Sequence, residues 1–153
     1  MTDSGRAGVL IRAAEFSDAA ILALLMSQLG YETRVAEMEM RLQSILLDSR
    51  YRTLVAVVDG RVCGMIGTFC HFTYEHNDPS ARILALVVEA QARGRGVGRA
   101  LIQAAEDDLA ARNMMRLSVD TRLTRKEAHL FYERLGYEKN GFRFVKTLPV
   151  QAD

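Results

Sequence analysis

The sequence predicts a single α/β domain built on a mixed sheet, and three observations support this fold class. The chain has 153 residues, the length of one ordinary domain, and 49% of them are hydrophobic, which is enough for a substantial core. Segments with strand and helix patterns follow one another in the order β-α-α-β-β-β-α-β-α-β-β, without internal repeats or a linker. We therefore expect residues 1–153 to form one domain of about seven strands and four helices.

The first half opens with a short strand at residues 9–13. Ser17 has the side chain of a helix N-cap, and the helix that follows ends at Gly30. Apolar residues at helical spacing predict a second helix over residues 33–47. Two strands, 51–58 and 61–74, are joined by Asp59-Gly60, a strong hairpin signal.

The second half begins with residues 82–88, which are nearly all apolar, as expected of a strand buried on both faces. A loop of glycine and arginine at 93–96 leads into a helix that ends near Arg112, and a fifth strand is predicted over 114–120. The helix at 124–135 is stopped by Gly136. A last extended stretch, 137–148, is interrupted by Asn140-Gly141 and supplies the final two strands.

Charge and composition exclude several functional classes. The net charge is +1, so no overall field favours nucleic acid or a membrane surface as a partner. Residues 1–8 lack the apolar core of a signal peptide, and the apolar runs are too short to span a bilayer, which predicts a cytoplasmic protein. Cys63 and Cys70 point to opposite faces of one predicted strand, so they cannot form a disulfide, and no spacing suits a metal ion.

Residues 86–99 (LVVEAQARGRGVGR) combine a buried strand, a glycine-rich turn and a helix start. The first amides of a helix have no partner within it and carry the positive end of its dipole, which favours an anion. Gly94, Gly96 and Gly98 let a ligand approach the backbone, and three arginines add positive charge. The segment therefore predicts a pyrophosphate site, with a structural turn and solvated arginines as the alternative.

Other phosphate loops do not fit this segment. A Walker loop needs Lys-Ser or Lys-Thr, which the chain lacks, and a Rossmann fingerprint needs glycine where Arg99 stands. The pattern [Q/R]xxGx[G/A] is met by Arg93, Gly96 and Gly98, and it follows the fourth predicted strand. In this the segment resembles the acetyl-coenzyme A loop of the GNAT superfamily of N-acetyltransferases.

The resemblance implies a fold and a cofactor site. The sheet would be mostly antiparallel, with its fourth and fifth strands splayed apart around the pantetheine arm. Acetyl-coenzyme A would be the co-substrate, with no metal. The residues that would bind it are Leu86, Val87, Val88, Arg93, Gly94, Arg95, Gly96, Val97, Gly98 and Arg99.

Residues 124–137 (TRKEAHLFYERLGY) match a second pattern of that family, A-x-x-[F/L]-Y-x-x-x-G-[F/Y]. Periodicity alone makes Tyr132 a half-buried aromatic of the helix. The resemblance implies instead a catalytic role, in which its phenol protonates the leaving thiolate. Many relatives have asparagine where Arg125 stands, so a phosphate contact and a surface role both stay open for it. His129 is interpreted as an exposed helical histidine.

The resemblance implies direct transfer of the acetyl group to a primary amine, most simply that of a small molecule. An alkylamine with a pKa of about 10 is mostly charged at neutral pH, so a base is needed, but Glu75, His76, Glu89 and Asp120 are not distinguished by spacing. The alternatives are a protein or peptide N-acetyltransferase and a non-catalytic acyl-coenzyme A module. Family members often form homodimers, so we expect one here, and residues 70–81 are expected to border the acceptor site.

Overall fold

The structure is a computed structural model, which describes residues 8–151. The chain divides into two compact units, Met1–Val119 and Asp120–Asp153. The first unit contains the sheet and three α-helices, and the second contains the last helix and the C-terminal stretch.

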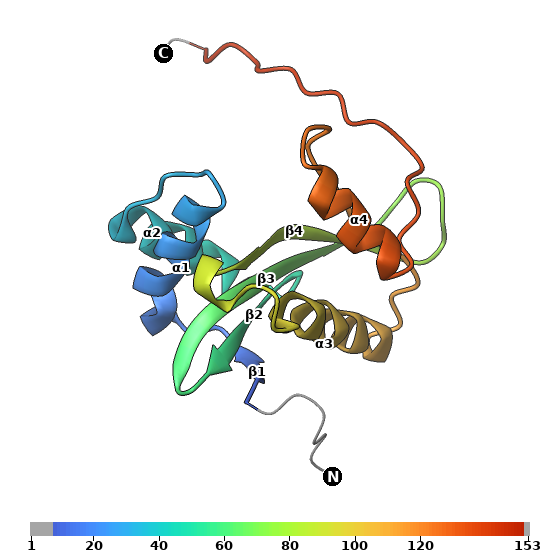
Figure 1. The fold of residues 1–153 in the computed structure, drawn as a ribbon. Coiled ribbons are helices and arrows are strands. Elements are labelled where there is room, and N and C mark those ends of the chain that lie inside the picture. The colour runs from blue at the N-terminus through green and yellow to red at the C-terminus, as the bar shows by residue number, and fades with distance from the viewer. Residues whose placement is uncertain (1–7, 152–153) are drawn as a thin grey trace. The chain divides into compact units, whose positions relative to one another are not determined.

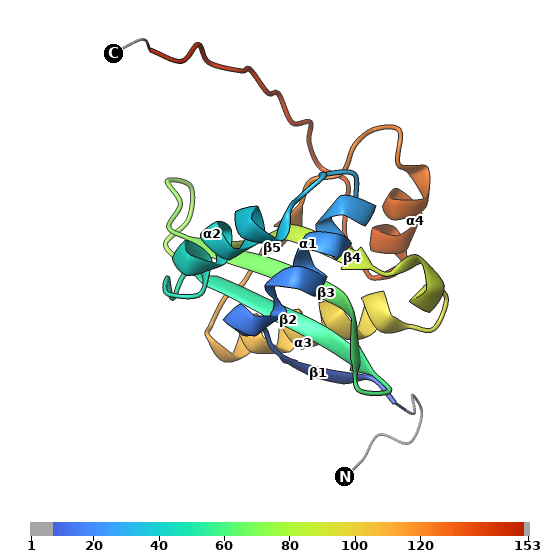
Figure 2. The same cartoon turned by 90° about the vertical axis from the view of Figure 1, so that its left-hand side faces the viewer.

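The first unit is built on a sheet of five strands in the order β1-β2-β3-β4-β5 (Figures 1 and 2). Pairs from β1 to β4 are antiparallel, whereas β5 runs parallel to β4, so the sheet is mixed as predicted. The strands are β1 (Leu10–Ala13), β2 (Tyr51–Val58), β3 (Arg61–His71), β4 (Ser80–Val88) and β5 (Leu117–Val119).

Helices cover both faces of this sheet, as Figure 2 shows with α1 and α2 in front and α3 behind. α1 (Ala19–Gln28) and α2 (Val35–Ile45) build one core, in which Leu22, Leu25, Met38 and Leu42 pack with Val55, Met65 and Val87. α3 (Val97–Ala111) covers the other face, where Leu109 packs with Cys70 and Ala81. Two short 3₁₀ helices, η1 (Phe16–Asp18) and η2 (Ala90–Ala92), precede α1 and α3.

Several local predictions are confirmed. Asp59 and Gly60 form the β2–β3 turn with φ angles of 51° and 75°, as the tight hairpin requires. Gly30 ends α1 with a φ of 108°. Cys63 and Cys70 are both free and buried in β3.

The predicted start of the first helix is wrong. Asp18, rather than Ser17, is the N-cap of α1, and η1 precedes it. The Asp18 carboxylate accepts two hydrogen bonds of 2.9 Å from the Arg12 guanidinium and one of 2.7 Å from the Glu15 amide. A buried carboxylate with these partners fixes the turn, and no serine hydroxyl can supply the same charge-assisted bonds.

The prediction of about seven strands is also wrong, because the sheet has five among residues 8–151. Residues 137–151 have extended or irregular backbone outside any strand. A strand forms only where a neighbouring backbone receives its hydrogen bonds, and in the described chain no segment pairs with this stretch. Its apolar side chains are consequently exposed, to 94% at Phe144 and 73% at Leu148.

Candidate functional site

One edge of β4 is open along the C-terminal half of the strand. β4 and β5 pair over three positions only, from Ala81 opposite Leu117 to Ile83 opposite Val119. β4 then continues to Val88, and within the described part of the first unit no strand pairs with residues 84–88 on that side. The register with β3 shifts at the same place, leaving Leu84 without an opposite residue. The backbone of Leu86, Val87 and Val88 therefore lies on the edge at which an extended ligand can bind.

The loop after β4 depends on left-handed glycines. Gly94 has a φ of 79° and Gly96 a φ of 78°, and Gly96 is the N-cap of α3. A side chain in this region costs about 1–2 kcal/mol, so the turn specifically needs glycine. The Val97 side chain is 2% exposed and fixes the first residue of α3 in the core.

The amides at the start of α3 are available to a ligand. The first recorded helical bond is from the Ala100 amide to the Gly96 carbonyl, at 3.0 Å. Across residues 8–151, no hydrogen bond is recorded from the amides of residues 96–99. A 15-residue helix thus presents its unpaired N–H groups and positive dipole end directly after two glycines.

The three arginines of the loop have different surroundings. Arg93 Nε donates a 3.1 Å hydrogen bond to the Val88 carbonyl, so this side chain braces the loop against the end of β4. Arg95 lines a cavity beside the loop, and Arg99 is exposed on the first turn of α3. The sequence predicts that all three surround the loop with positive charge, and their roles toward a ligand stay predictions.

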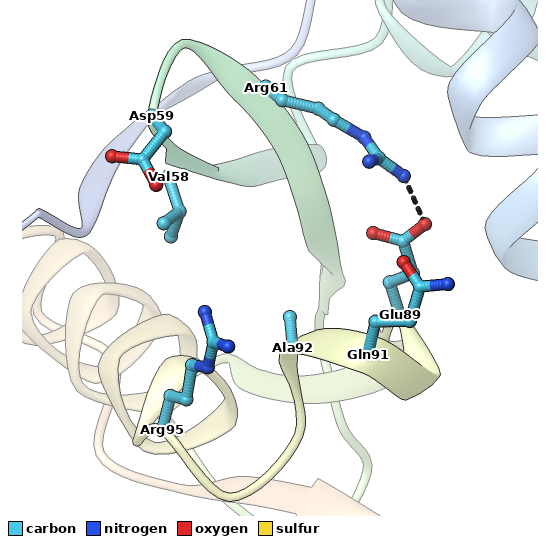
Figure 3. Close-up of a pocket in the computed structure, with 7 residues that line it drawn as sticks. All are labelled: Val58, Asp59, Arg61, Glu89, Gln91, Ala92 and Arg95. Atoms are coloured by element: carbon cyan, nitrogen blue, oxygen red, sulfur yellow. Dashed lines mark hydrogen bonds and ion pairs between the residues drawn. The ribbon is translucent and has the colours of Figure 1, made fainter.

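The cavity beside the loop has a volume of about 280 Å³ (Figure 3). Glu89, 7% exposed, forms an ion pair there with Arg61 from the start of β3. The Glu89 amide donates to the Cys63 carbonyl at 2.7 Å, and the Ala90 amide donates to Gln28 Oε1 at 3.3 Å. These contacts tie the beginning of the loop to β3 and to the end of α1.

Sequence reasoning missed this anchoring. Arg61 and Gln28 lie far from Glu89 in the chain, and no motif connects them. The sequence identifies Glu89 only as a candidate general base, whereas in the structure its carboxylate accepts a hydrogen bond from Arg61. A buried acid directly after a strand and before a phosphate loop was the one available signal.

The second unit contains α4 (Lys126–Arg134), which carries the tyrosine motif. Gly136 has a φ of 91°, its amide donates to the Glu133 carbonyl, and the Tyr137 amide donates to the Tyr132 carbonyl, both at 3.0 Å. These two bonds define a Schellman motif, in which the residue after the glycine usually contacts the helix. The Tyr137 and Tyr132 rings make that contact, edge to face with centroids 5.6 Å apart.

The Tyr132 phenol is the protonated species at neutral pH. Burial raises the pKa of Tyr132 above its ordinary value, and the charge of Arg125 lowers it by a smaller amount. The same ring also contacts Phe131, with centroids 5.3 Å apart. Arg125 is the N-cap residue of α4.

The polar residues considered for proton transfer have different surroundings. His129 Nε2 lies 2.9 Å from the Arg122 carbonyl, which can only accept, so this nitrogen carries a proton. The Asp120 carboxylate lies 3.9 Å from Arg143 Nε. Glu75 and His76 are exposed on the loop between β3 and β4. None of these contacts identifies the general base.

A second cavity of about 420 Å³ lies over β2, β3 and β4, and His71 is its member from the segment expected to border the acceptor. Tyr74 of the same segment is fully exposed. In the described chain there is no cluster of three His, Cys, Asp or Glu residues fit to hold a metal ion. Nor does any helix of residues 8–151 combine the length and apolarity needed to cross a bilayer.

Comparison with known proteins agrees with this geometry. The model of the Acetyltransferase (GNAT) family matches residues 19–137. The aminoalkylphosphonate N-acetyltransferase of Salmonella typhimurium is 34% identical over 103 residues, which cover 67% of each chain. Human N-acetylaspartate synthetase is 29% identical over 62% of this chain, but the match spans only 30% of that longer protein. The solved structure of a GNAT family acetyltransferase from Staphylococcus aureus superposes with a TM-score of 0.80 at 26% identity, covering 92% of this chain and 99% of the other.

Proposed function

The chain belongs to the GNAT family of acetyltransferases and is therefore an acyltransferase, and from this premise we propose that it moves an acetyl group from acetyl-coenzyme A directly to a primary amine of a small molecule. The observation that carries the proposal is the set of amides at residues 96–99, which have no hydrogen-bond partner among residues 8–151 and lie at the start of α3, where Gly94 and Gly96 have positive φ angles. Donors of this kind, at the positive end of a helix dipole, suit a diphosphate.

The pantetheine arm is proposed to lie along the open edge of β4. An extended amide chain can bond to residues 86–88 as another strand would, because no strand of the described first unit occupies that edge. The cofactor residues are then those of this edge, Leu86, Val87 and Val88, together with the loop residues Arg93, Gly94, Arg95, Gly96, Val97, Gly98 and Arg99. Val97 contributes its amide alone, since its side chain is buried.

Tyr132 is proposed as the general acid that protonates the departing thiolate. This role rests on the family motif, and the raised pKa of Tyr132 supports it because a phenol must hold its proton to donate it. The family model spans parts of both units, which supports the prediction that residues 1–153 act as one N-acetyltransferase domain. The reaction needs no covalent enzyme intermediate and no metal.

The acceptor is proposed to be a small molecule because one relative is named for such a substrate, an amine that also bears a phosphonate. A cytoplasmic location stays a prediction. The homodimer also stays a proposal, supported by the exposed apolar side chains of residues 142–150, since apolar patches of this kind mark interaction surfaces.

Replacing Gly96 tests the phosphate site. Gly96→Ala places a Cβ on a residue with a φ of 78°, so the turn must change and its amides lose their common direction. We expect the dissociation constant for acetyl-coenzyme A to rise about 100-fold, since several charge-assisted bonds are lost together. Isothermal titration calorimetry measures it.

Gly60→Ala is the matched control, because Gly60 has a φ of 75° in the β2–β3 turn and nothing lies within 4 Å of the added Cβ. It should cost a similar amount of stability and leave cofactor affinity unchanged. Equal affinities for the two variants would refute the phosphate site.

A further inference from the structure

The second cavity extends from the open edge of β4 to the end of β3. It has a volume of about 420 Å³, and the residues that line it are Tyr51, Phe69, His71, Arg82 and Leu84. β5 pairs with β4 only as far as Ile83, so Leu84 is the first residue of the open edge. The proposed function brings the end of the pantetheine arm to this edge, and the present inference therefore rests on that function.

His71 lies at the far end of the same cavity. It is the last residue of β3 and pairs with Ser80, four residues before Leu84 on β4. At about 3.3 Å per residue, this places His71 about 13 Å from Leu84 along the sheet. An acceptor whose amine meets the thioester beside Leu84 fills part of that distance, and one water in the cavity can relay a proton over the rest.

The hydrogen bond of His71 defines which ring nitrogen can act as a base. His71 Nδ1 lies 3.1 Å from the carbonyl oxygen of Phe72, which can only accept, so Nδ1 carries the proton. In the neutral ring, Nε2 then has a free electron pair. Among residues 8–151, no hydrogen bond or ion pair is recorded at this nitrogen.

A neighbouring ring fixes the position of His71. The rings of Phe69 and His71 are stacked, with centroids 5.8 Å apart and an angle of 21° between their planes. Tyr51 extends this row, since its ring centroid is 4.7 Å from that of Phe69. A base works best when its geometry is set before the substrate arrives, and the stack and the bond to Phe72 together provide this.

The other candidate bases do not share these features. The Glu89 carboxylate forms an ion pair with Arg61, and Nε2 of His129 carries a proton. His76 is exposed on the loop between β3 and β4 and is not among the residues that line the second cavity. His71 therefore combines an open electron pair, a fixed ring and a place in the cavity that reaches the edge of β4.

We propose that His71 is the general base, whose Nε2 takes a proton from the acceptor ammonium, directly or through one water. The electron pair freed on the amine nitrogen forms the C–N bond with the acetyl carbon, while the C–S bond breaks. The thiolate that leaves takes a proton from the general acid. The nitrogen loses two protons in all: one replaces the proton given to the thiolate, and the other passes through His71 to solvent.

His71→Phe tests the base without removing the stack, because phenylalanine keeps a ring beside Phe69 and lacks both nitrogens. A panel of β-alanine, 2-aminoethylphosphonate and ethylamine first identifies the fastest acceptor, with release of the coenzyme thiol as the measure of rate. For that amine, we expect kcat/KM to fall about 100-fold or more. The dissociation constant for acetyl-coenzyme A, measured by calorimetry, should not change. His76→Phe is the matched control and should keep the wild-type rate.

His71→Ala adds a chemical rescue, since it leaves room for a free imidazole in the place of the ring. Imidazole added to the assay should raise the rate of His71→Ala at least about 10-fold. It should not raise the rate of His71→Phe, whose ring fills that space. A purely structural histidine predicts no such difference between the two variants. A His71→Phe variant with wild-type kcat/KM, or a His71→Ala variant that imidazole does not rescue, would overturn the proposal.

The same measurements separate this inference from the proposed function. If acetyl-coenzyme A does not bind, or if it binds and no amine of the panel is acetylated, the proposed function is refuted and this inference with it. If the wild-type protein acetylates an amine and His71→Phe does so at the same rate, the proposed function stands and only the role of His71 is refuted.

Discussion

The glycine loop at residues 94–99 and the tyrosine segment at residues 126–137 both carry a motif of the family, but local structure explains them to different degrees. In the tyrosine segment, Gly136 provides the positive φ that ends α4, and Tyr137 packs on Tyr132. In the glycine loop, Gly94 and Gly96 build a turn that leaves the amides of residues 96–99 without a recorded partner in the described chain.

This difference shows what each motif can support. When the hydrogen-bonding groups and rings of a segment contact one another, the segment keeps its structure with or without a ligand. Its geometry alone therefore says little about its chemistry. A segment that leaves several donors unpaired at a helix start requires water or a ligand there. The phosphate site therefore rests on geometry and resemblance together, whereas the acid role of Tyr132 rests on resemblance and on its pKa.

Tyr132→Phe has the largest expected effect, and it tests whether Tyr132 has a role beyond local structure. Phenylalanine keeps the ring contact with Tyr137 and the end of α4 and removes only the hydroxyl. If the hydroxyl is the general acid, kcat falls about 100-fold or more, with cofactor affinity unchanged. Steady-state kinetics and calorimetry measure the two quantities.

Tyr132→Ala is the companion variant, because it removes the ring as well. It should lower the free energy of unfolding by about 1 kcal/mol in addition to the loss from the apolar area that is no longer buried.

The raised pKa of Tyr132 also predicts how the rate depends on pH. The phenol keeps its proton up to and beyond its usual pKa of about 10, so its ionisation causes no loss of rate between pH 7 and 9. Full activity of Tyr132→Phe would leave Tyr132 with its local structural role only.

Glu89→Gln tests whether the anchoring of the glycine loop matters for binding. The Glu89 side chain is 10% exposed and its partner Arg61 is 61% exposed, so solvent screens the pair on one side only. Losing the charge should loosen the start of the loop and raise the dissociation constant for acetyl-coenzyme A about 10-fold. Calorimetry again gives the value.

A double-mutant cycle with Arg61→Gln separates the pair from other effects of each change. If the ion pair positions the loop, the double variant should bind about as well as either single variant. Fully additive losses would show that Glu89 and Arg61 act independently.

Much of the fold follows from local signals in the sequence. Asp59-Gly60 specifies a two-residue turn by its backbone preference, and the apolar run at 82–88 predicts a strand. The same holds for the loop, whose glycines at 94 and 96 adopt the positive φ angles that a phosphate turn needs. These features depend on a few neighbouring residues, so one sequence suffices. The expectation that the strand at 82–88 is buried on both faces is wrong, since Leu84 is 51% exposed.

Features that depend on distant partners were not predictable. The final strands were inferred from residues 137–148, but strand formation requires a neighbouring backbone, which composition does not report. The ion pair between Arg61 and Glu89, and the pair between Arg12 and Asp18, join residues through the fold. The second cavity likewise combines side chains from three strands, and periodicity identifies Phe69 and Arg82 only as strand residues.

The smallest expected effect is on stability alone. Its size can be compared with the stability losses of the other variants. The hydrogen bonds from Arg12 lower the pKa of Asp18, whose side chain is 9% exposed. Asp18→Asn keeps the shape and removes the charge, so we expect a loss of about 1–2 kcal/mol in the free energy of unfolding at pH 7, measured by urea denaturation. Cofactor affinity should not change.

The pH dependence gives this prediction its sign. Because the folded-state pKa is depressed, the stabilisation is fully present above the unfolded pKa of about 4 and disappears as pH falls through the lower folded value. Asp48→Asn is the control: hydrogen bonds from Arg50 lower the pKa of Asp48 to about 2, but Arg50 is 64% exposed, so the loss should be smaller. If Asp18→Asn is as stable as wild type at pH 7 and unfolds in acid in the same way, the pair between Arg12 and Asp18 does not hold the start of α1. The stability losses of the loop variants would then need an explanation of their own.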